Sequence, residues 1–253
     1  MIPSALTVAG SDPSGGAGLQ ADLKTFHQFG VYGQSAVTLV TVQNTLGVEQ
    51  VHLLPPDLVV AQMEAVLRDI RPLAIKTGAL GSQSLVEALA RSAPAWNAPL
   101  VIDPVLFSKN GAPLSSANPR ALFPYAALVT PNLDEAAALT GLAVHSVPTM
   151  RQAARELQDQ GARSVLIKGG HLPGDRSVDV LLHGAGFTEF AAERIPTRHT
   201  HGTGCTFSAA ITALLACGLD LIPAIARAKA FITEAIRTNP GLGHGQGPVN
   251  HWA

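Results

Sequence analysis

Residues 5–26, ALTVAGSDPSGGAGLQADLKTF, contain the change of pattern that decides the fold. Ala5–Ala9 is a short apolar run of the length of a buried β-strand, and residues 10–18 form a nine-residue loop with four glycines. Apolar residues such as Leu19 and Leu23 then recur at helical spacing. This segment therefore predicts a strand, a glycine-rich loop and a helix in succession.

The same alternation continues to the end of the chain and predicts a mostly parallel sheet with helices on both faces, an α/β fold in a single domain over residues 1–253. Ligands in such sheets bind where the strands end. The further strands are expected at residues 36–42, 73–76, 100–103, 127–129 and 164–168, with an antiparallel pair at 178–182 and 188–195. The further helices are expected at 56–70, 82–93, 133–140, 149–160, about 204–216 and 221–237.

Composition limits the class of protein and of partner. The chain has 253 residues, 47% hydrophobic and 14% charged, with a formal net charge of −1. This excludes intrinsic disorder and argues against a nucleic-acid binder, which needs clustered Lys and Arg. Two cysteines give no disulfide framework, and no secretory signal is evident, so we expect a cytoplasmic protein. The apolar stretch 207–226 is interrupted by polar residues and predicts a buried helix, not a membrane span.

Residues 200–206, THGTGCT, precede an Ala-rich helix and are the strongest local signal for chemistry. Glycines allow close backbone approach to a ligand, and a helix start offers unpaired N–H groups and partial positive charge, so an anion is expected here. The same field predicts a lowered pKa for the Cys205 thiol. The alternative is a flexible glycine turn before a buried cysteine.

Other polar residues follow predicted strands. The loop 10–18 suits close approach to a small molecule, although it could be only a long turn. Asn132 and Glu135 share one helix face and could hold Mg²⁺ through its waters, although an N-terminal cap with Glu at its third position gives the same pattern. Asp103 could add negative charge near the metal, and Lys168 could reach a phosphate.

The histidines give no recognisable metal or triad spacing, so His171, His199 and His201 are interpreted as ordinary polar or loop residues.

Taken together in order, these segments resemble the ribokinase-like superfamily and, within it, the hydroxymethylpyrimidine/phosphomethylpyrimidine kinases of thiamin biosynthesis. The resemblance covers nearly the whole chain and implies a three-layer ribokinase-like fold. The segments that carry it are residues 5–26, QNT at 43–45, IDPV at 102–105, TPNLDEA at 130–136, KGGH at 168–171, THGTGCT at 200–206 and GQGPV at 245–249.

The resemblance implies ATP-dependent phosphorylation of 4-amino-5-hydroxymethyl-2-methylpyrimidine and then of its monophosphate. Gln43 would meet the aminopyrimidine edge, with Gly10, Ala17 and Asp22 near the same pocket. Gly202, Thr203 and Gly204 would surround the transferring phosphoryl group, and Cys205 would be the base. Lys168 would approach the ATP phosphates, and Asn132, Glu135 and Asp103 would organise Mg²⁺ and its waters.

Three points stay open at this stage. A pyridoxal/pyridoxine kinase of the same superfamily is the nearest alternative, although residues 43–45 and 168–170 favour the pyrimidine enzyme, and a non-catalytic ligand-binding module is a second alternative. Ala79 and Leu106 stand where the family usually has Met, so the pocket is expected to be reshaped. A homodimer is expected from the superfamily, without a segment that identifies the interface.

Overall fold

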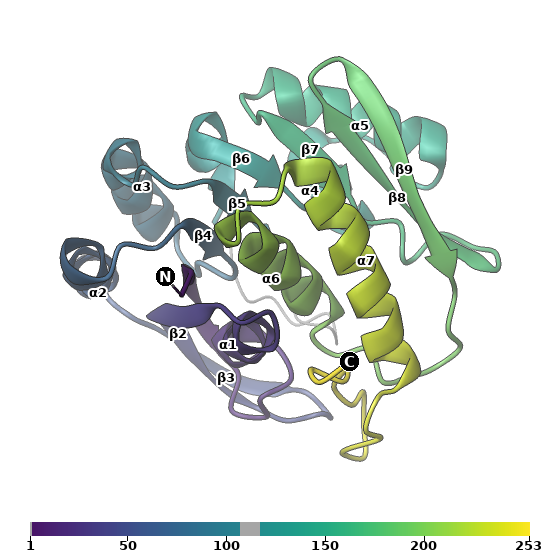
Figure 1. The fold of residues 1–253 in the computed structure, drawn as a ribbon, viewed down its shortest axis with the longest axis horizontal. Coiled ribbons are helices and arrows are strands. Elements are labelled where there is room, and N and C mark those ends of the chain that lie inside the picture. The colour runs from purple at the N-terminus through teal and green to yellow at the C-terminus, as the bar shows by residue number, and fades with distance from the viewer. Residues whose placement is uncertain (1, 107–116) are drawn as a thin grey trace.

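A computed structural model describes residues 2–106 and 117–253, and it contains one nine-stranded sheet with the order β3-β2-β1-β4-β5-β6-β7-β8-β9 (Figure 1). All neighbours from β2 across to β7 pair in parallel, whereas β3, β8 and β9 join antiparallel. The strands are β1 (Ser4–Ser11), β2 (Tyr32–Gln43), β3 (Val48–Leu53), β4 (Ala74–Thr77), β5 (Leu100–Ile102), β6 (Ala126–Val129), β7 (Ser164–Ile167), β8 (Arg176–His183) and β9 (Gly186–Glu193).

Helices cover both faces of this sheet, which confirms the predicted α/β class. In Figure 1 the helices α1, α6 and α7 lie across the near face, and α6 runs over the central strands. The helices are α1 (Gly18–Gln28), α2 (Pro56–Asp69), α3 (Gln83–Ser92), α4 (Leu133–Thr140), α5 (Val147–Asp159), α6 (Thr203–Ala216) and α7 (Leu221–Arg237), with 3₁₀ turns η1 (Ala93–Ala95) and η2 (Pro119–Tyr125).

The alternation of side chains along the strands builds two cores. In β5, Leu100 and Ile102 point into one hydrophobic cluster, while Val101 between them joins the cluster under α6 and α7. Successive strand residues face opposite sides, so a strand covered by helices on both faces must be apolar throughout. This explains why the central strands are continuous apolar runs in the sequence.

The stretch 207–226 spans the end of one helix and the start of the next, which confirms the two helices predicted at about 204–216 and 221–237. Helix α6 ends at Ala216, and Gly218 turns the chain with φ 85° before α7 begins at Leu221. Most residues of α6 are buried, which accounts for its continuous apolar character. Across the part of the chain that the structure describes, no helix combines the length and the apolar character needed to cross a membrane.

Strand β3 is the main element that the sequence analysis missed. Apolar and polar residues do not alternate regularly along it, since Glu49 and Gln50 are adjacent, and most of its residues are exposed. Only its antiparallel pairing with β2, in which Leu39 faces Leu53, holds it extended. Such an edge strand is defined by its partner and not by its own pattern.

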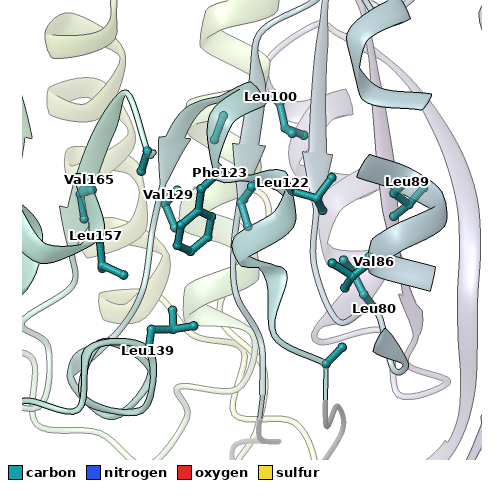
Figure 2. Close-up of a cluster of buried hydrophobic side chains, with 14 of the residues drawn as sticks. Leu80, Val86, Leu89, Leu100, Leu122, Phe123, Val129, Leu139, Leu157 and Val165 are labelled. Atoms are coloured by element: carbon teal, nitrogen blue, oxygen red, sulfur yellow. The ribbon is translucent and has the colours of Figure 1, made fainter. Parts of the chain in front are cut away.

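Phe123 lies at the centre of the larger core, where η2 packs over β6 with Val129 and Leu122 (Figure 2). Its side chain is fully buried, whereas Tyr125 in the same turn is 41% exposed. We predict that Phe123→Ala lowers the free energy of unfolding in urea by about 3–5 kcal/mol, because it leaves a cavity. The matched change Tyr125→Ala should cost less than about 1 kcal/mol. Equal losses would contradict this packing.

Candidate active site

A cavity of about 850 Å³ opens at the carboxyl ends of the parallel strands, where the fold predicts a ligand site. The loops after β1, β4, β5 and β7 and the start of α6 all reach it, although they are far apart in the sequence. Of the predicted site residues, those that line it are Gly10, Ala17, Gln43, Asp103, Asn132, Glu135, Lys168, Gly202, Thr203, Gly204 and Cys205.

The start of α6 packs directly against the loop after β1. Gly202 has φ 79°, and a Cβ there would lie 1.8 Å from the carbonyl oxygen of Gly16. Only glycine fits this contact. Thr203 closes the turn, since its hydroxyl donates to the Thr200 carbonyl at 2.7 Å and its N–H to the same oxygen at 3.3 Å. The N–H groups of Gly204 and Cys205 belong to the first helical turn, which leaves backbone donors for an anion.

A buried pair of Asp12 and His201 joins the same two loops. The Asp12 Oδ2 atom lies 2.8 Å from His201 Nε2, and it also accepts from the Ala17 N–H at 2.9 Å. Burial would raise the pKa of Asp12, but hydrogen bonds from His201 and Ser14 outweigh it and lower the pKa. The interpretation of His201 as an ordinary loop histidine is therefore wrong: its side chain is buried and holds two site loops together.

Lys76 is a strand-end residue to which the sequence analysis assigned no role in the site. It lies one residue before the end of β4, lines the cavity and donates to Asp22 Oδ2 at 2.9 Å, with both side chains fully buried. Burial would lower the pKa of the ammonium, but the charge and hydrogen bond of Asp22, together with the nearby Cys205 and Asp103, outweigh it and the pKa rises. Asp22, predicted near the substrate pocket, does not itself line the cavity but contacts Lys76, which does, and Thr7 also donates to Asp22 at 2.5 Å. A strand-end lysine opposite an acid in the first helix was the available signal.

Lys168 and Asp103 form a second ion pair beside α6. The Nζ–Oδ1 distance is 2.6 Å, and Ser208 of α6 donates to the other oxygen of Asp103 at 3.0 Å. Burial would raise the pKa of Asp103, but the two nearby lysines outweigh it and lower the pKa. A Cβ on Gly204 would lie 3.2 Å from Lys168 Nζ, so the ammonium is adjacent to the helix start. A cation and helix N–H groups thus converge on one region.

The prediction of a lowered pKa for Cys205 is wrong. Burial raises the pKa of its thiol to about 12, and the carboxylates of Asp22 and Asp103 raise it further. Lys76 and the N–H of Gly18, which donates to the sulfur, offset only part of this effect. The field of the helix start is present, but loss of water around the sulfur is the larger effect.

Asn132 and Glu135 form a complete capping box at the start of α4, the structural alternative considered for this pair. Asn132 Oδ1 accepts from the Glu135 N–H, and Glu135 Oε2 accepts from the Asn132 N–H, both at 2.8 Å. Burial raises the pKa of Glu135 to about 7, partly offset by Lys168. Capping does not exclude a second role, because both residues also line the cavity.

The residues fit a magnesium ion that is held mainly by water and phosphate. Within residues 2–106 and 117–253, no group of three or more His, Cys, Asp or Glu side chains is arranged to hold a metal. Mg²⁺ keeps several waters and usually takes only one or two carboxylates together with substrate phosphates. Asp103 and Glu135 supply two carboxylates beside the same cavity.

The raised pKa of Glu135 has a measurable effect on stability. Between pH 4.5 and 7 the unfolded chain loses this proton before the folded chain does, so stability falls as pH rises. We predict that without metal or nucleotide the wild type loses about 2–3 kcal/mol between pH 5 and 8 relative to Glu135→Gln. Gln keeps the capping box. Parallel urea titrations of the two proteins measure this difference, and equal pH dependence would contradict it.

The C-terminal segment, residues 245–249, fixes the turn that follows Gln43 at the end of β2. The N–H of Gln246 donates to the Thr45 carbonyl at 2.9 Å, and the N–H of His201 donates to the Gly247 carbonyl at 3.0 Å. This segment thus links residues 43–45 with the start of α6. It explains why residue 245 is a glycine, since a Cβ there would meet the Thr45 backbone.

Comparison with known proteins identifies the family. The sequence model described as phosphomethylpyrimidine kinase matches residues 12–250. The chain belongs to the phosphomethylpyrimidine kinase family. A hydroxymethylpyrimidine/phosphomethylpyrimidine kinase of Haemophilus influenzae is 48% identical, with 100% of this chain and 97% of that protein covered. The Bacillus subtilis protein of the same name is 44% identical, with 100% and 96% covered.

One relative is a longer protein than this chain. The chain is 50% identical to the thiamine biosynthesis bifunctional protein ThiED of Geobacter sulfurreducens, and 98% of the chain spans about half (52%) of that protein. The matched half is therefore one part of a protein that combines two activities.

Solved structures similar to this kinase-family chain carry two different names. A phosphomethylpyrimidine kinase from Clostridium difficile has a TM-score of 0.80 at 40% identity, covering 92% of this chain and 99% of that one. The pyridoxal kinase from Staphylococcus aureus in complex with pyridoxal has a TM-score of 0.92 at 39% identity, covering 100% and 94%. The ribokinase-like fold is confirmed, and both vitamin kinases remain close in structure.

Proposed function

We propose that this chain is an ATP-dependent kinase that phosphorylates 4-amino-5-hydroxymethyl-2-methylpyrimidine and then its monophosphate, giving the diphosphate used in thiamin biosynthesis. The observation that carries the proposal is the placement of Gln43, Cys205 and Lys168 around one cavity in a chain of this family. The carboxamide of Gln43 can donate and accept at once, as an aminopyrimidine edge requires.

Phosphoryl transfer is catalysed mainly by positioning and by neutralising charge on the phosphoryl oxygens. Helix N–H groups at Gly204 and Cys205 and the ammonium of Lys168 supply these charges without a large basic surface. Asp103 fixes the position of Lys168 through the 2.6 Å ion pair. Gly202 allows the helix start to approach the substrate loop closely enough for both reacting groups to share the cavity.

ATP and Mg²⁺ are the proposed co-substrate and metal. When bound, Mg²⁺ would neutralise phosphate charge, and Asn132, Glu135 and Asp103 would hold its waters. Related structures support the nucleotide, because the Staphylococcus aureus pyridoxal kinase is known in complex with ADP and with AMP-PCP.

The deciding assay compares two alcohols with the purified protein and Mg-ATP. We expect turnover of the hydroxymethylpyrimidine to a monophosphate and then a diphosphate, with a higher kcat/KM than for pyridoxal. A large preference for pyridoxal would establish the alternative, which is favoured by the structural similarity to pyridoxal kinases. Absence of ATP consumption with every candidate alcohol would instead support a non-catalytic binding module.

Cys205 should contribute more to the rate of the first phosphorylation than to the rate of the second. The first acceptor is a hydroxyl group that must lose a proton, whereas the second is a phosphate monoester, mostly ionised at pH 7 with a pKa of about 6. We predict that Cys205→Ala slows the first step by about 100-fold or more and the second by less than about 3-fold.

The raised pKa of Cys205 adds a pH signature. Only the thiolate can accept the proton, so the first-step rate should rise with pH up to at least pH 9 in the wild type. This dependence should be absent in Cys205→Ala. Single-turnover measurements of both steps provide the test, and equal losses in the two steps would refute the base role.

The remaining expectations concern assembly and location. We propose one kinase domain and a homodimer, because Val40 and Val42 on one face of β2 are each 42% exposed and could pack against a second copy. Sedimentation of the wild type and of Val42→Lys tests the dimer.

The partners expected are small molecules, without nucleic acid or membrane. A cytoplasmic location fits an enzyme that consumes ATP and has two free cysteines.

A further inference from the structure

The side chain of Gln43 is surrounded by groups that determine which way its amide points. Thr41, two residues earlier on β2, lies 3.2 Å from Gln43 Oε1, and His201 Nε2 lies 3.4 Å from Gln43 Nε2. Thr41 and His201 are themselves buried and line the cavity. Neither has a role in the function proposed above.

The hydrogen on His201 Nε2 is fixed by Asp12. That nitrogen lies 2.8 Å from the Asp12 carboxylate, whose pKa is lowered and which therefore accepts only. A bare ring nitrogen would face a negative charge there. His201 Nε2 consequently carries a hydrogen in both the neutral and the charged ring. Asp12 holds that hydrogen, and the protonated nitrogen has no lone pair with which to accept from Gln43.

The hydroxyl hydrogen of Thr41 also has a fixed acceptor. Its hydroxyl lies 3.0 Å from the Ser11 carbonyl oxygen, which can only accept. The Thr41 hydroxyl therefore donates to Ser11 and retains lone pairs for another donor.

These two neighbours distinguish the two orientations of the Gln43 amide. If the amide Nε2 lies toward His201, its N–H faces the N–H of His201, so two donors meet. The amide oxygen and the Ser11 carbonyl oxygen then compete for the one hydroxyl hydrogen of Thr41. After a half-turn about the terminal bond, the amide oxygen faces the N–H of His201, whose hydrogen Asp12 holds, and the amide nitrogen donates to Thr41. The contact with Thr41 then joins a donor to an acceptor, and the positive end of the His201 N–H faces an oxygen instead of a second N–H group. Hydrogen-bond networks are the proper basis for assigning such amides.

We propose that Thr41 and His201 are specificity-determining residues, which lock the amide of Gln43 with its oxygen toward His201 and its nitrogen toward Thr41. One N–H and one oxygen lone pair then remain for the ligand in a fixed order. An aromatic edge with a ring nitrogen beside an exocyclic amino group matches that order. Pyridoxal has no amino group beside its ring nitrogen and cannot form both bonds.

The inference rests on the proposed function, and binding measurements separate the two. The test compares the wild type, Thr41→Val and Thr41→Ser by calorimetric Kd and by kcat/KM, each with the hydroxymethylpyrimidine and with pyridoxal. Val preserves the shape and strand preference of Thr but removes the hydroxyl, while Ser restores it. Thr140→Val, which removes a hydroxyl bonded to the Ala136 carbonyl at 2.7 Å on α4, is the matched control.

We expect Thr41→Val to weaken hydroxymethylpyrimidine binding and kcat/KM by about 10-fold, because one buried amide group loses its partner. Pyridoxal should change by less than about 3-fold. Thr41→Ser should return close to wild-type values, and Thr140→Val should not alter the ratio of the two alcohols.

Equal losses for both alcohols, no loss in Thr41→Val, or an unrescued Thr41→Ser would overturn the inference. Wild-type binding of the pyrimidine without turnover would refute the proposed function, while the Kd series would still decide the role of Thr41. No pyrimidine binding by the wild type would overturn both.

Discussion

The contact between the loop after β1 and the start of α6 is the constraint on which the cavity depends. Asp12 and His201 are 189 residues apart in the sequence, yet their side chains meet at 2.8 Å. Gly16 and Gly202 bring the two backbones together in a space that admits no Cβ. Parallel topology makes this possible, because all carboxyl ends of the central strands reach the same edge of the sheet.

Buried charge in the site is balanced in pairs. Asp22 with Lys76, Asp103 with Lys168, and Asp12 with His201 each place an acid against a cationic or hydrogen-bonding partner. Removing either member would leave a buried charge unpaired, which is far more costly than the pair itself. These pairs hold the positions of the cavity side chains, and they explain how a chain with a net charge of −1 can form a phosphate site.

The sequence revealed much of this site for a physical reason. Glycines, strand-end polar residues and a helix start are local features, and each marks a place where backbone can approach a ligand. Local patterns could not show that Lys76 lies against Asp22, or that His201 is buried, because those contacts join distant segments. They also could not give the pKa of Cys205, since a helix start and a loss of solvent shift it in opposite directions.

The sequence by itself determined the α/β class, nearly every central strand and helix, and the family resemblance, because periodicity and glycine placement act over a few residues. The tertiary structure alone decided that β3 is a strand, since only pairing with β2 supports its polar residues. It also decided the direction of the Gln43 amide, which depends on hydrogens held by Asp12 and Ser11. Hydrogen bonds between distant segments exist only after the chain has folded.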